Sequence, residues 1–252
     1  MNVYWLEQRE ADVPVEDGWL SAGEAARLTG MRVAKRRADW RLGRWTAKRA
    51  LAIYLGLPSH PSALAHLEIR PASSGAPEAF FAGQAAAATI SLSHRAGMAM
   101  CAVTPAGAAL GCDLELVETR SDAFIADYFT LGEQALVARA LAADRPRLLA
   151  LLWSAKESTL KALREGLRLD TRRVVVNLGD WDRPLTSSHG FPDWRPLQVG
   201  LAAGQTFRGW WRHTGGLVRT IVAVPPPAEP IALAIPADAD ANICREHVAT
   251  RA

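Results

Sequence analysis

The short stretch "GCDLE", residues 111–115, combines two acidic side chains with a regular alternation of apolar and polar residues. This alternation predicts a β-strand in which Gly111, Asp113 and Glu115 share one face. Two carboxylates on one face repel each other unless a cation lies between them, and Mg²⁺ takes such oxygen ligands together with substrate phosphates. The stretch therefore predicts a metal site, with Gly111 leaving room for a substrate. The alternative is an exposed strand with two solvated acids.

A second charged group lies in "LLWSAKESTLKAL", residues 151–163, which has no Pro or Gly and is rich in Leu, Ala, Lys and Glu. These residue types favour a helix. Trp153, Glu157 and Lys161 follow one another at intervals of four, so they line one stripe of that helix. A Glu–Lys pair on a wet face, which stabilises a helix by about 0.2–0.5 kcal/mol, explains the charges if the segment is taken alone.

A third stretch, "SLSHRAG" at residues 91–97, places Ser93 and His94 at the end of a predicted strand. Such a pair can donate hydrogen bonds to a phosphate, although a turn serine beside an exposed histidine is the simpler alternative. The chain contains no G-x-S-x-G nucleophile elbow, which argues against a serine hydrolase. It also contains neither G-x-x-x-x-G-K-[ST] nor G-x-G-x-x-G, which argues against a nucleotide held by a P-loop.

The positive charge of the chain is concentrated in one segment. Residues 32–49 hold eight basic residues and one acid, although the whole chain has a net charge of only +3. The pattern from about residue 33 to 55 predicts a helix with an apolar face. The basic side chains on one narrow stripe beside that face are Arg37, Arg41, Arg44 and Lys48. This stripe predicts a surface that binds an anion.

In this order and spacing, the motifs resemble those of the 4′-phosphopantetheinyl transferases. The residues that carry the resemblance are Ser93-His94, then Gly111, Asp113 and Glu115 in G-x-D-x-E, then W-x-x-K-E-x-x-x-K from Trp153 to Lys161. The resemblance covers residues 30–224 or so and is to the large single-chain class, which has two lobes. It implies an α+β fold made of two similar, pseudo-symmetric α/β lobes.

The resemblance implies an enzyme that transfers the 4′-phosphopantetheine arm of coenzyme A to a serine of an apo acyl or peptidyl carrier protein. Mg²⁺ is the implied metal, and 3′,5′-ADP is the implied second product. Asp113, Glu115 and Glu157 match the metal ligands of the family. Glu157 also matches the base that accepts the serine proton, and Lys161 matches a lysine near the pyrophosphate.

Contacts to coenzyme A are implied by the same resemblance. The residues that match them are Lys161, Ser93, His94, Arg41, Arg44 and Lys48. The loop "SGAPEAF" departs from the family pattern, because Ala76 stands where the family often has a basic residue. We expect either that another cation, such as Arg70, replaces this contact or that the contact is absent.

Turn and capping signals arrange the chain as helices followed by strands, twice. The expected helices follow Ser21, run from 33 to 55, follow a capping box of Thr130 and Glu133, and run from 145 to 165. The expected strands lie near 66–70, 88–93, 97–103, 108–116, 172–178, 196–202, 206–213 and 216–224. This order indicates an N-terminal lobe, 1–107, a C-terminal lobe, 108–224, and a Pro-rich linker and tail, 225–252. The tail is either disordered or lies on the body through "IALAI".

Composition indicates where the protein is located and which kinds of partner it has. The acidic stretch of residues 1–19 lacks the apolar core of a signal peptide, and three scattered cysteines indicate reduced thiols in a cytoplasmic protein. We expect a monomer with no membrane and no nucleic-acid partner. Two alternatives stay open. One is a non-enzymatic nucleic-acid-binding module that uses the basic helix, and the other is a metal-dependent phosphodiesterase with water as nucleophile.

Overall fold

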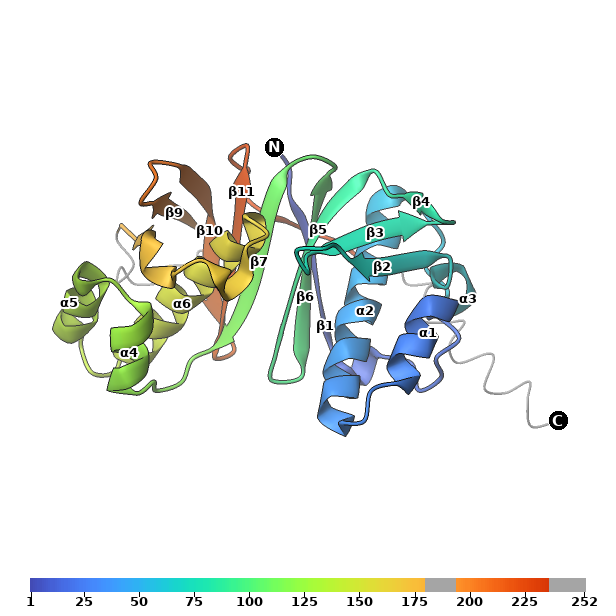
Figure 1. Cartoon of the computed structure of the whole chain (residues 1–252), viewed down its shortest axis with the longest axis horizontal. Helices are drawn as coiled ribbons and strands as arrows, with labels where there is room; N and C mark the ends of the chain where they lie inside the picture. Colours follow the sequence, from blue (N-terminus) through green and yellow to red (C-terminus); the bar gives the residue numbers. More distant parts are fainter. Residues whose placement is uncertain (180–193, 236–252) are drawn as a thin grey trace. The chain divides into compact units, whose positions relative to one another are not determined.

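The computed structural model of the chain describes residues 1–179 and 194–235, apart from the side chain of Leu167. The chain forms two compact units (Figure 1). The N-terminal unit contains Tyr4–Gly107 and the segment that begins at Ile231, and the C-terminal unit contains Met1–Val3 and Ala108–Pro230. The chain therefore passes between the units at three points. None of the described helices has both the length and the apolar character that crossing a bilayer requires.

The N-terminal unit consists of two sheets with helices. Its elements are β1 (Tyr4–Arg9), η1 (Glu10–Asp12), α1 (Ala22–Thr29), α2 (Ala34–Leu55), α3 (Pro61–Leu64), β2 (Leu67–Pro71), β3 (Pro77–Phe81), β4 (Gln84–Ala85), β5 (Ala88–Arg95), β6 (Met98–Pro105) and β12 (Ile231–Ala232). One sheet has the strand order β12-β1-β6-β5 and the other has β2-β3-β4. Helix α2 packs on β1, β5 and β6.

Local signals in the sequence account for the helices of this unit. Helix α1 begins with a capping box, in which the Ser21 side chain accepts from the Glu24 backbone and the Glu24 side chain accepts from the Ser21 backbone. Helix α2 ends at Gly56, whose φ of 66° is in the left-handed region that favours glycine. Between these signals, Ala47 and Leu51 are fully buried and seat α2 in the apolar core.

Within the described residues, the C-terminal unit consists of one antiparallel sheet, a long helix that packs on it, and two shorter helices that contact the long one. Its elements are β7 (Ala109–Leu116), α4 (Asp122–Tyr128), α5 (Leu131–Arg139), α6 (Arg145–Ala162), η2 (Gly166–Arg168), η3 (Thr171–Arg173), β8 (Val174–Asn177), β9 (Arg195–Leu201), β10 (Thr206–Thr214) and β11 (Leu217–Val224). The strand order is β7-β11-β10-β9-β8. Helix α6 lies along β7 and β11, and its buried leucines form the core with residues of the sheet.

The two units share a plan. In each, a strand is followed by a short helix with a capping box, then by a long helix, and then by antiparallel strands (Figure 1). The capping box of α5 consists of Thr130 and Glu133, as the sequence predicts. The expected α+β fold is therefore confirmed.

Several boundaries differ from the sequence-based expectations. Helix α6 ends at Ala162 and not at 165, because Arg164 already has a left-handed φ of 59° before Gly166. Strands β1 and β12 were not predicted, and they pair in parallel, with Tyr4 opposite Ile231. Leu233 packs against the N-terminal core, so the start of "IALAI" does lie on the body. The rest of the predicted tail, residues 236–252, lies outside the described residues.

Candidate active site

Gly111 allows helix α6 to lie directly on strand β7. A Cβ atom at this position would be 1.7 Å from the carbonyl oxygen of Ser158, closer than any side chain can approach. The face that Gly111 shares with Asp113 is therefore covered by a helix. The expectation that Gly111 leaves room for a substrate is wrong, because the α6 backbone fills that space.

Buried hydroxyl groups hold α6 on the neighbouring strand β11. Ser154, Ser158 and Thr220 are all fully buried. The Thr220 hydroxyl lies 2.9 Å from the Ser154 hydroxyl and also contacts the hydroxyl of Ser158. Ser158 further donates to the Thr220 carbonyl at 3.3 Å. Because Thr220 is the cross-strand partner of Asp113, this network fixes the helix beside the acidic strand.

Asp113 and Lys161 form an ion pair across this helix–strand contact. Lys161 Nζ lies 2.7 Å from Asp113 Oδ1 and donates to the Cys112 carbonyl at 3.1 Å. The Asp113 side chain is 5% exposed and that of Lys161 is 28% exposed. Burial lowers the pKa of Lys161, but the Asp113 charge and its neighbours outweigh burial, so the pKa is raised. Asp113 is thus a buried carboxylate, not the exposed one that a solvated strand face would carry.

Glu157 lies within electrostatic reach of the same pair. Burial raises the pKa of the Glu157 carboxyl, the Asp113 charge raises it further, and Lys161 opposes both. Glu157 and Lys161 are therefore not a solvent-exposed ion pair, which was the alternative explanation of these charges. A partly buried carboxyl with a raised pKa, next to a lysine, is the arrangement that a general base for phosphoryl transfer requires.

Trp153, the first residue of the helical stripe, packs among aromatic side chains. The ring of Trp153 packs against the rings of Phe124 and Tyr128 on α4, with centroids 5.1 and 5.0 Å away. Trp153 therefore ties α6 to α4 through apolar contact, while Glu157 and Lys161 supply the charged groups.

Glu115 is held by an arginine that the sequence motifs did not indicate. Arg120 lies 3.0 Å from a Glu115 oxygen and 3.2 Å from a Glu118 oxygen, and its guanidinium stacks on Phe124. In the C-terminal unit, Asp113 and Glu115 are thus each paired with a different basic side chain. A cation close after the D-x-E motif is a sequence signal that would have suggested this pairing.

Carboxylate oxygens are suitable ligands for Mg²⁺, which proteins hold through one or two carboxylates and several waters. Within the described residues, no three His, Cys, Asp or Glu side chains come close enough together to hold a metal ion. The predicted set of three carboxylates is therefore not gathered. The chemistry of Asp113 and Glu157 fits a hard cation, and a contribution from Glu115 stays a prediction.

Ser93 and His94 lie in the N-terminal unit, on strand β5. Ser93 is buried and His94 is exposed, because consecutive side chains on a strand point to opposite faces. The two residues therefore do not present one joint surface on that strand. Arg70, the suggested replacement for a cation at Ala76, pairs with Glu68 at 2.7 Å and stacks on the Phe80 ring.

The basic stripe of α2 lies against residues 14–31 and not on an open face, and Arg37 donates to the carbonyls of residues 28 and 31. Arg41 donates to Asp17 and to the carbonyls of residues 14 and 15. Arg44 lies 3.6 Å from Glu24, and its side chain is 13% exposed. Lys48 is fully buried and pairs with Glu24. The prediction that Lys48 binds a phosphate is contradicted by this burial, whereas the basic residues exposed in the segment include Arg32 and Arg36.

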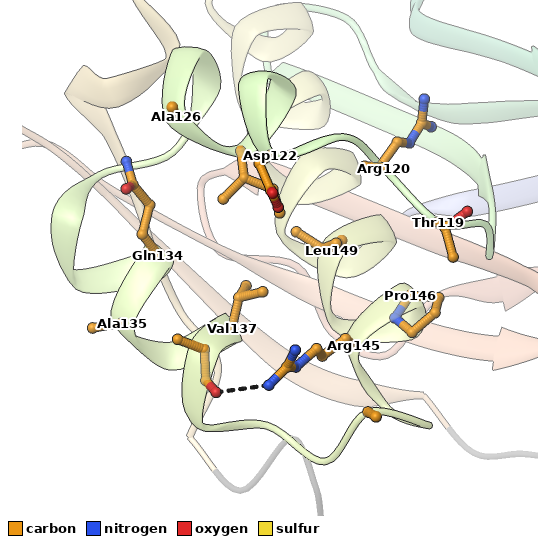
Figure 2. Close-up of a pocket in the computed structure, with 13 residues that line it drawn as sticks. Thr119, Arg120, Asp122, Ala126, Gln134, Ala135, Val137, Arg145, Pro146 and Leu149 are labelled. Atoms are coloured by element: carbon orange, nitrogen blue, oxygen red, sulfur yellow. Dashed lines mark hydrogen bonds between the residues drawn. The ribbon is translucent and has the colours of Figure 1, made fainter.

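A cavity of about 700 Å³ opens between α4, α5 and the start of α6. Ile125, Val137 and Leu149 supply apolar walls, and Arg145 crosses its lower side to donate to a carbonyl of α5 (Figure 2). Arg120 lines the opposite side, as Figure 2 shows. Arg120 also pairs with Glu115 and so connects the cavity wall to that residue of β7.

Comparison with protein families gives one match within the C-terminal unit. Residues 109–207 match the family model described as the 4′-phosphopantetheinyl transferase superfamily. This part of the chain belongs to that superfamily. The matched residues contain Asp113, Glu115, Glu157 and Lys161, whereas the basic stripe and Ser93 lie outside the match. No curated protein sequence matches the chain.

The match confirms the family that the sequence motifs resemble. It also supports a transferase of the phosphopantetheinyl kind, because the helix and strand that carry the charged cluster lie inside the matched residues. The predicted coenzyme A contacts other than Lys161 lie in the N-terminal unit, outside the match, and their role stays a prediction.

Proposed function

We propose that the protein transfers the 4′-phosphopantetheine arm of coenzyme A to a serine of an apo acyl or peptidyl carrier protein, with release of 3′,5′-ADP. The observation that carries the proposal is the contact of β7 and α6, which brings Asp113, Glu157 and Lys161 together within the superfamily segment. Phosphoryl transfer depends mainly on positioning and on stabilisation of charge, and a rigid helix–strand contact supplies both.

Each of the three residues has a distinct role in the proposed reaction. Glu157 accepts the proton of the carrier serine as the serine oxygen bonds to phosphorus. The bond between that phosphorus and the bridging oxygen breaks, and 3′,5′-ADP leaves with the bond electrons. Lys161 stabilises the negative charge that develops on the phosphate oxygens, and Asp113 holds the Lys161 ammonium at 2.7 Å.

The superfamily uses coenzyme A and a divalent metal, and we extend both to this protein. When bound, Mg²⁺ would supply positive charge that lowers the cost of charge development in the transfer. Asp113 and Glu157 are the residues that would hold it, with Glu115 as a third ligand once it leaves Arg120. The carboxylates supply the hard oxygen ligands that this ion prefers.

The N-terminal unit supplies the proposed coenzyme A contacts. Arg41 and Arg44 stay candidates for the 3′-phosphate, and Ser93 and His94 for the other phosphates. Arg44→Ala should raise the KM for coenzyme A more than the KM for dephospho-coenzyme A, which lacks the 3′-phosphate. Steady-state kinetics with the two substrates measures the difference, and equal changes would remove Arg44 from the 3′-phosphate site.

The direct test is mass spectrometry of purified apo-carriers after incubation with the protein, coenzyme A and Mg²⁺. The expected result is one phosphopantetheine adduct on the carrier, which disappears when the acceptor serine is replaced by alanine. Glu157→Gln should lose the adduct, whereas Glu165→Gln, a more exposed acid near the end of the same helix, should keep it. Free phosphopantetheine with an unmodified carrier would instead identify a phosphodiesterase, and no turnover of coenzyme A would overturn both readings.

A further inference from the structure

Lys156, which directly precedes Glu157, is fully buried and bonded on every side. Its ammonium lies 2.9 Å from Glu133 Oε2, donates to the Thr171 carbonyl at 2.9 Å, and also donates to the Val174 carbonyl. An ammonium has three N–H donors, and these three acceptors use all of them. Since Lys156 has no exposed surface, it does not touch a substrate.

The acidic partner, Glu133, connects Lys156 to two further elements. Glu133 is 4% exposed and is the third residue of α5, where one of its oxygens accepts from the Thr130 backbone at 2.8 Å. Its other oxygen accepts from the Val176 backbone of β8 at 3.0 Å. The Glu133–Lys156 pair therefore joins the start of α5, the middle of α6 and the start of the edge strand β8.

The N-terminal unit contains the same arrangement at the corresponding elements. Glu24 is the third residue of α1, completes its capping box with Ser21, and accepts from the Ile69 backbone of β2 at 3.0 Å. Lys48 of α2 pairs with Glu24 and donates to the Trp19 carbonyl at 2.9 Å. Each ammonium also lies over an aromatic ring that precedes the short helix, Trp19 in one unit and Phe129 in the other.

A buried ion pair is weak evidence for stability, because the cost of removing two charges from water offsets much of their attraction. The pair nevertheless recurs in both units at the same junction, and this recurrence favours a role in setting geometry. In each unit it fixes the long helix to the capped end of the short helix and to a strand. In the C-terminal unit the helix so fixed carries Glu157 and Lys161.

The polar contacts of α6 come from three directions around its second half. Ser154 and Ser158 bind Thr220 of β11, Lys161 binds Asp113 of β7, and Lys156 binds Glu133 at the junction of α5 and β8. The first two sets hold the helix to the sheet along β7 and β11. Lys156 supplies a further contact, to α5, η3 and β8.

We propose that the Glu133–Lys156 pair is a positioning device that sets the rotation of α6, and through it the places of Glu157 and Lys161 in the transfer reaction. Lys156 is a positioning residue, not a catalytic one. The inference rests on the proposed function. A displacement of about 1 Å in a reacting group can reduce a rate by about 100-fold, so a small rotation of α6 has a large effect on turnover.

The test compares Lys156→Met, which keeps the length of the side chain but removes the ammonium, with Val199→Ala. Val199 is fully buried on β9 opposite Val176, whose backbone binds Glu133, and serves as a control for loss of core stability beside the pair without loss of charge. Glu133→Gln is the milder second variant, because the amide keeps an acceptor for the capping box. Single-turnover transfer and the KM for coenzyme A are measured at a temperature at which circular dichroism shows every variant folded.

We expect the single-turnover rate of Lys156→Met to fall by at least about 10-fold, with a change of less than about 3-fold in the KM for coenzyme A. Glu133→Gln should show a smaller loss of rate with the same unchanged KM, and Val199→Ala should keep the wild-type rate. Equal rates for Lys156→Met and Val199→Ala would show that the pair only stabilises the fold. A KM that rises in step with the loss of rate would make Lys156 part of the coenzyme A site and would also overturn the proposal.

Hydrogen–deuterium exchange separates a failure of this inference from a failure of the proposed function. If the wild-type protein transfers nothing, the proposed function fails, but the positioning role still predicts a change in exchange. In Lys156→Met the backbone amides of residues 157–161 should exchange faster, while those of residues 148–152 in the first half of α6 should change less. Uniform loss of protection along α6, or none, would overturn the positioning role.

Discussion

The surroundings of the Glu157 carboxyl disfavour its ionised form. Activity needs that ionised form, whereas the stability of the fold is lowered by it. Burial first, and the Asp113 charge second, raise its pKa. Turnover should fall as the pH drops through this raised pKa, because the protonated carboxyl cannot accept a proton. Glu157→Gln should reduce single-turnover transfer by about 10²–10⁴-fold, the usual contribution of a general base.

The same variant should unfold at a higher concentration of urea at neutral pH. A carboxyl whose pKa is higher in the folded than in the unfolded state loses stability as the pH rises through the folded value. The amide cannot ionise, so Glu157→Gln avoids this loss, and its advantage should vanish below the ordinary pKa of glutamate. Urea titrations at several pH values check this, and a variant less stable than wild type at neutral pH would contradict the raised pKa.

Arg120 and a divalent metal compete for Glu115. The guanidinium lies 3.0 Å from the Glu115 carboxylate, and it also adds a positive charge that repels a cation. A unit charge and a divalent cation about 4 Å apart in water interact by about 2 kcal/mol, so Arg120→Ala should tighten Mg²⁺ binding by up to about thirtyfold. Calorimetric titration with Mg²⁺ measures the change without any turnover.

The control for this prediction is Arg139→Ala, which removes an equal charge from an exposed position near the end of α5. It should leave Mg²⁺ affinity close to that of the wild type. If Arg120→Ala and Arg139→Ala behave alike, Glu115 is not a metal ligand and the site consists of Asp113 and Glu157 alone.

At the scale of elements, helix α6 lies directly against strand β7 at Gly111. Gly111→Ala should destabilise the fold by about 3 kcal/mol or more, the upper end for overpacking, because the new Cβ meets helix backbone that cannot turn aside. Transfer by the folded fraction should also fall, since α6 carries Glu157 and Lys161. Urea unfolding and single-turnover kinetics measure the two effects.

Gly43→Ala is the matched control, because Gly43 lies inside helix α2 and a Cβ there meets no described atom within 4 Å. This change should stabilise the protein by about 0.5–1 kcal/mol through the helix preference for alanine. If Gly111→Ala behaves like Gly43→Ala, the helix is not as close to the strand as the contact distance states.

Short sequence patterns predict many of the helices and strands that position the candidate site. The N-cap at Ser21, the capping box of Thr130 and the alternation around Asp113 predict α1, α5 and β7 correctly. Local patterns cannot tell which face of β7 a helix covers, so the burial of Asp113 was not predicted. The burial of Lys48 was missed for the same reason. A helical stripe of cations looks alike whether it faces water or a glutamate 24 residues earlier in the chain.

At the scale of the whole molecule, neither unit is one continuous stretch of the sequence. A division near residue 107 follows from the repeated order of helices and strands. That order does not predict that the first three residues belong to the C-terminal unit. Nor does it predict that the segment from Ile231 belongs to the N-terminal unit. Strand β12 consists of two residues paired with a strand more than two hundred positions away, and no local pattern encodes such a pairing.

Because the chain crosses between the units, each half of the sequence lacks a short segment of its own unit. A cut between Gly107 and Ala108 yields a first fragment that lacks β12 of its own unit, because the second fragment carries residues 231–235. The second fragment in turn lacks Met1, whose carbonyl accepts from the Ala228 backbone at 2.8 Å. The two fragments, expressed together, should therefore assemble by mutual complementation and co-purify through a tag on one of them. Removing residues 1–3 from the first and 231–252 from the second should abolish that co-purification, and its survival would show that the exchanged ends do not join the halves.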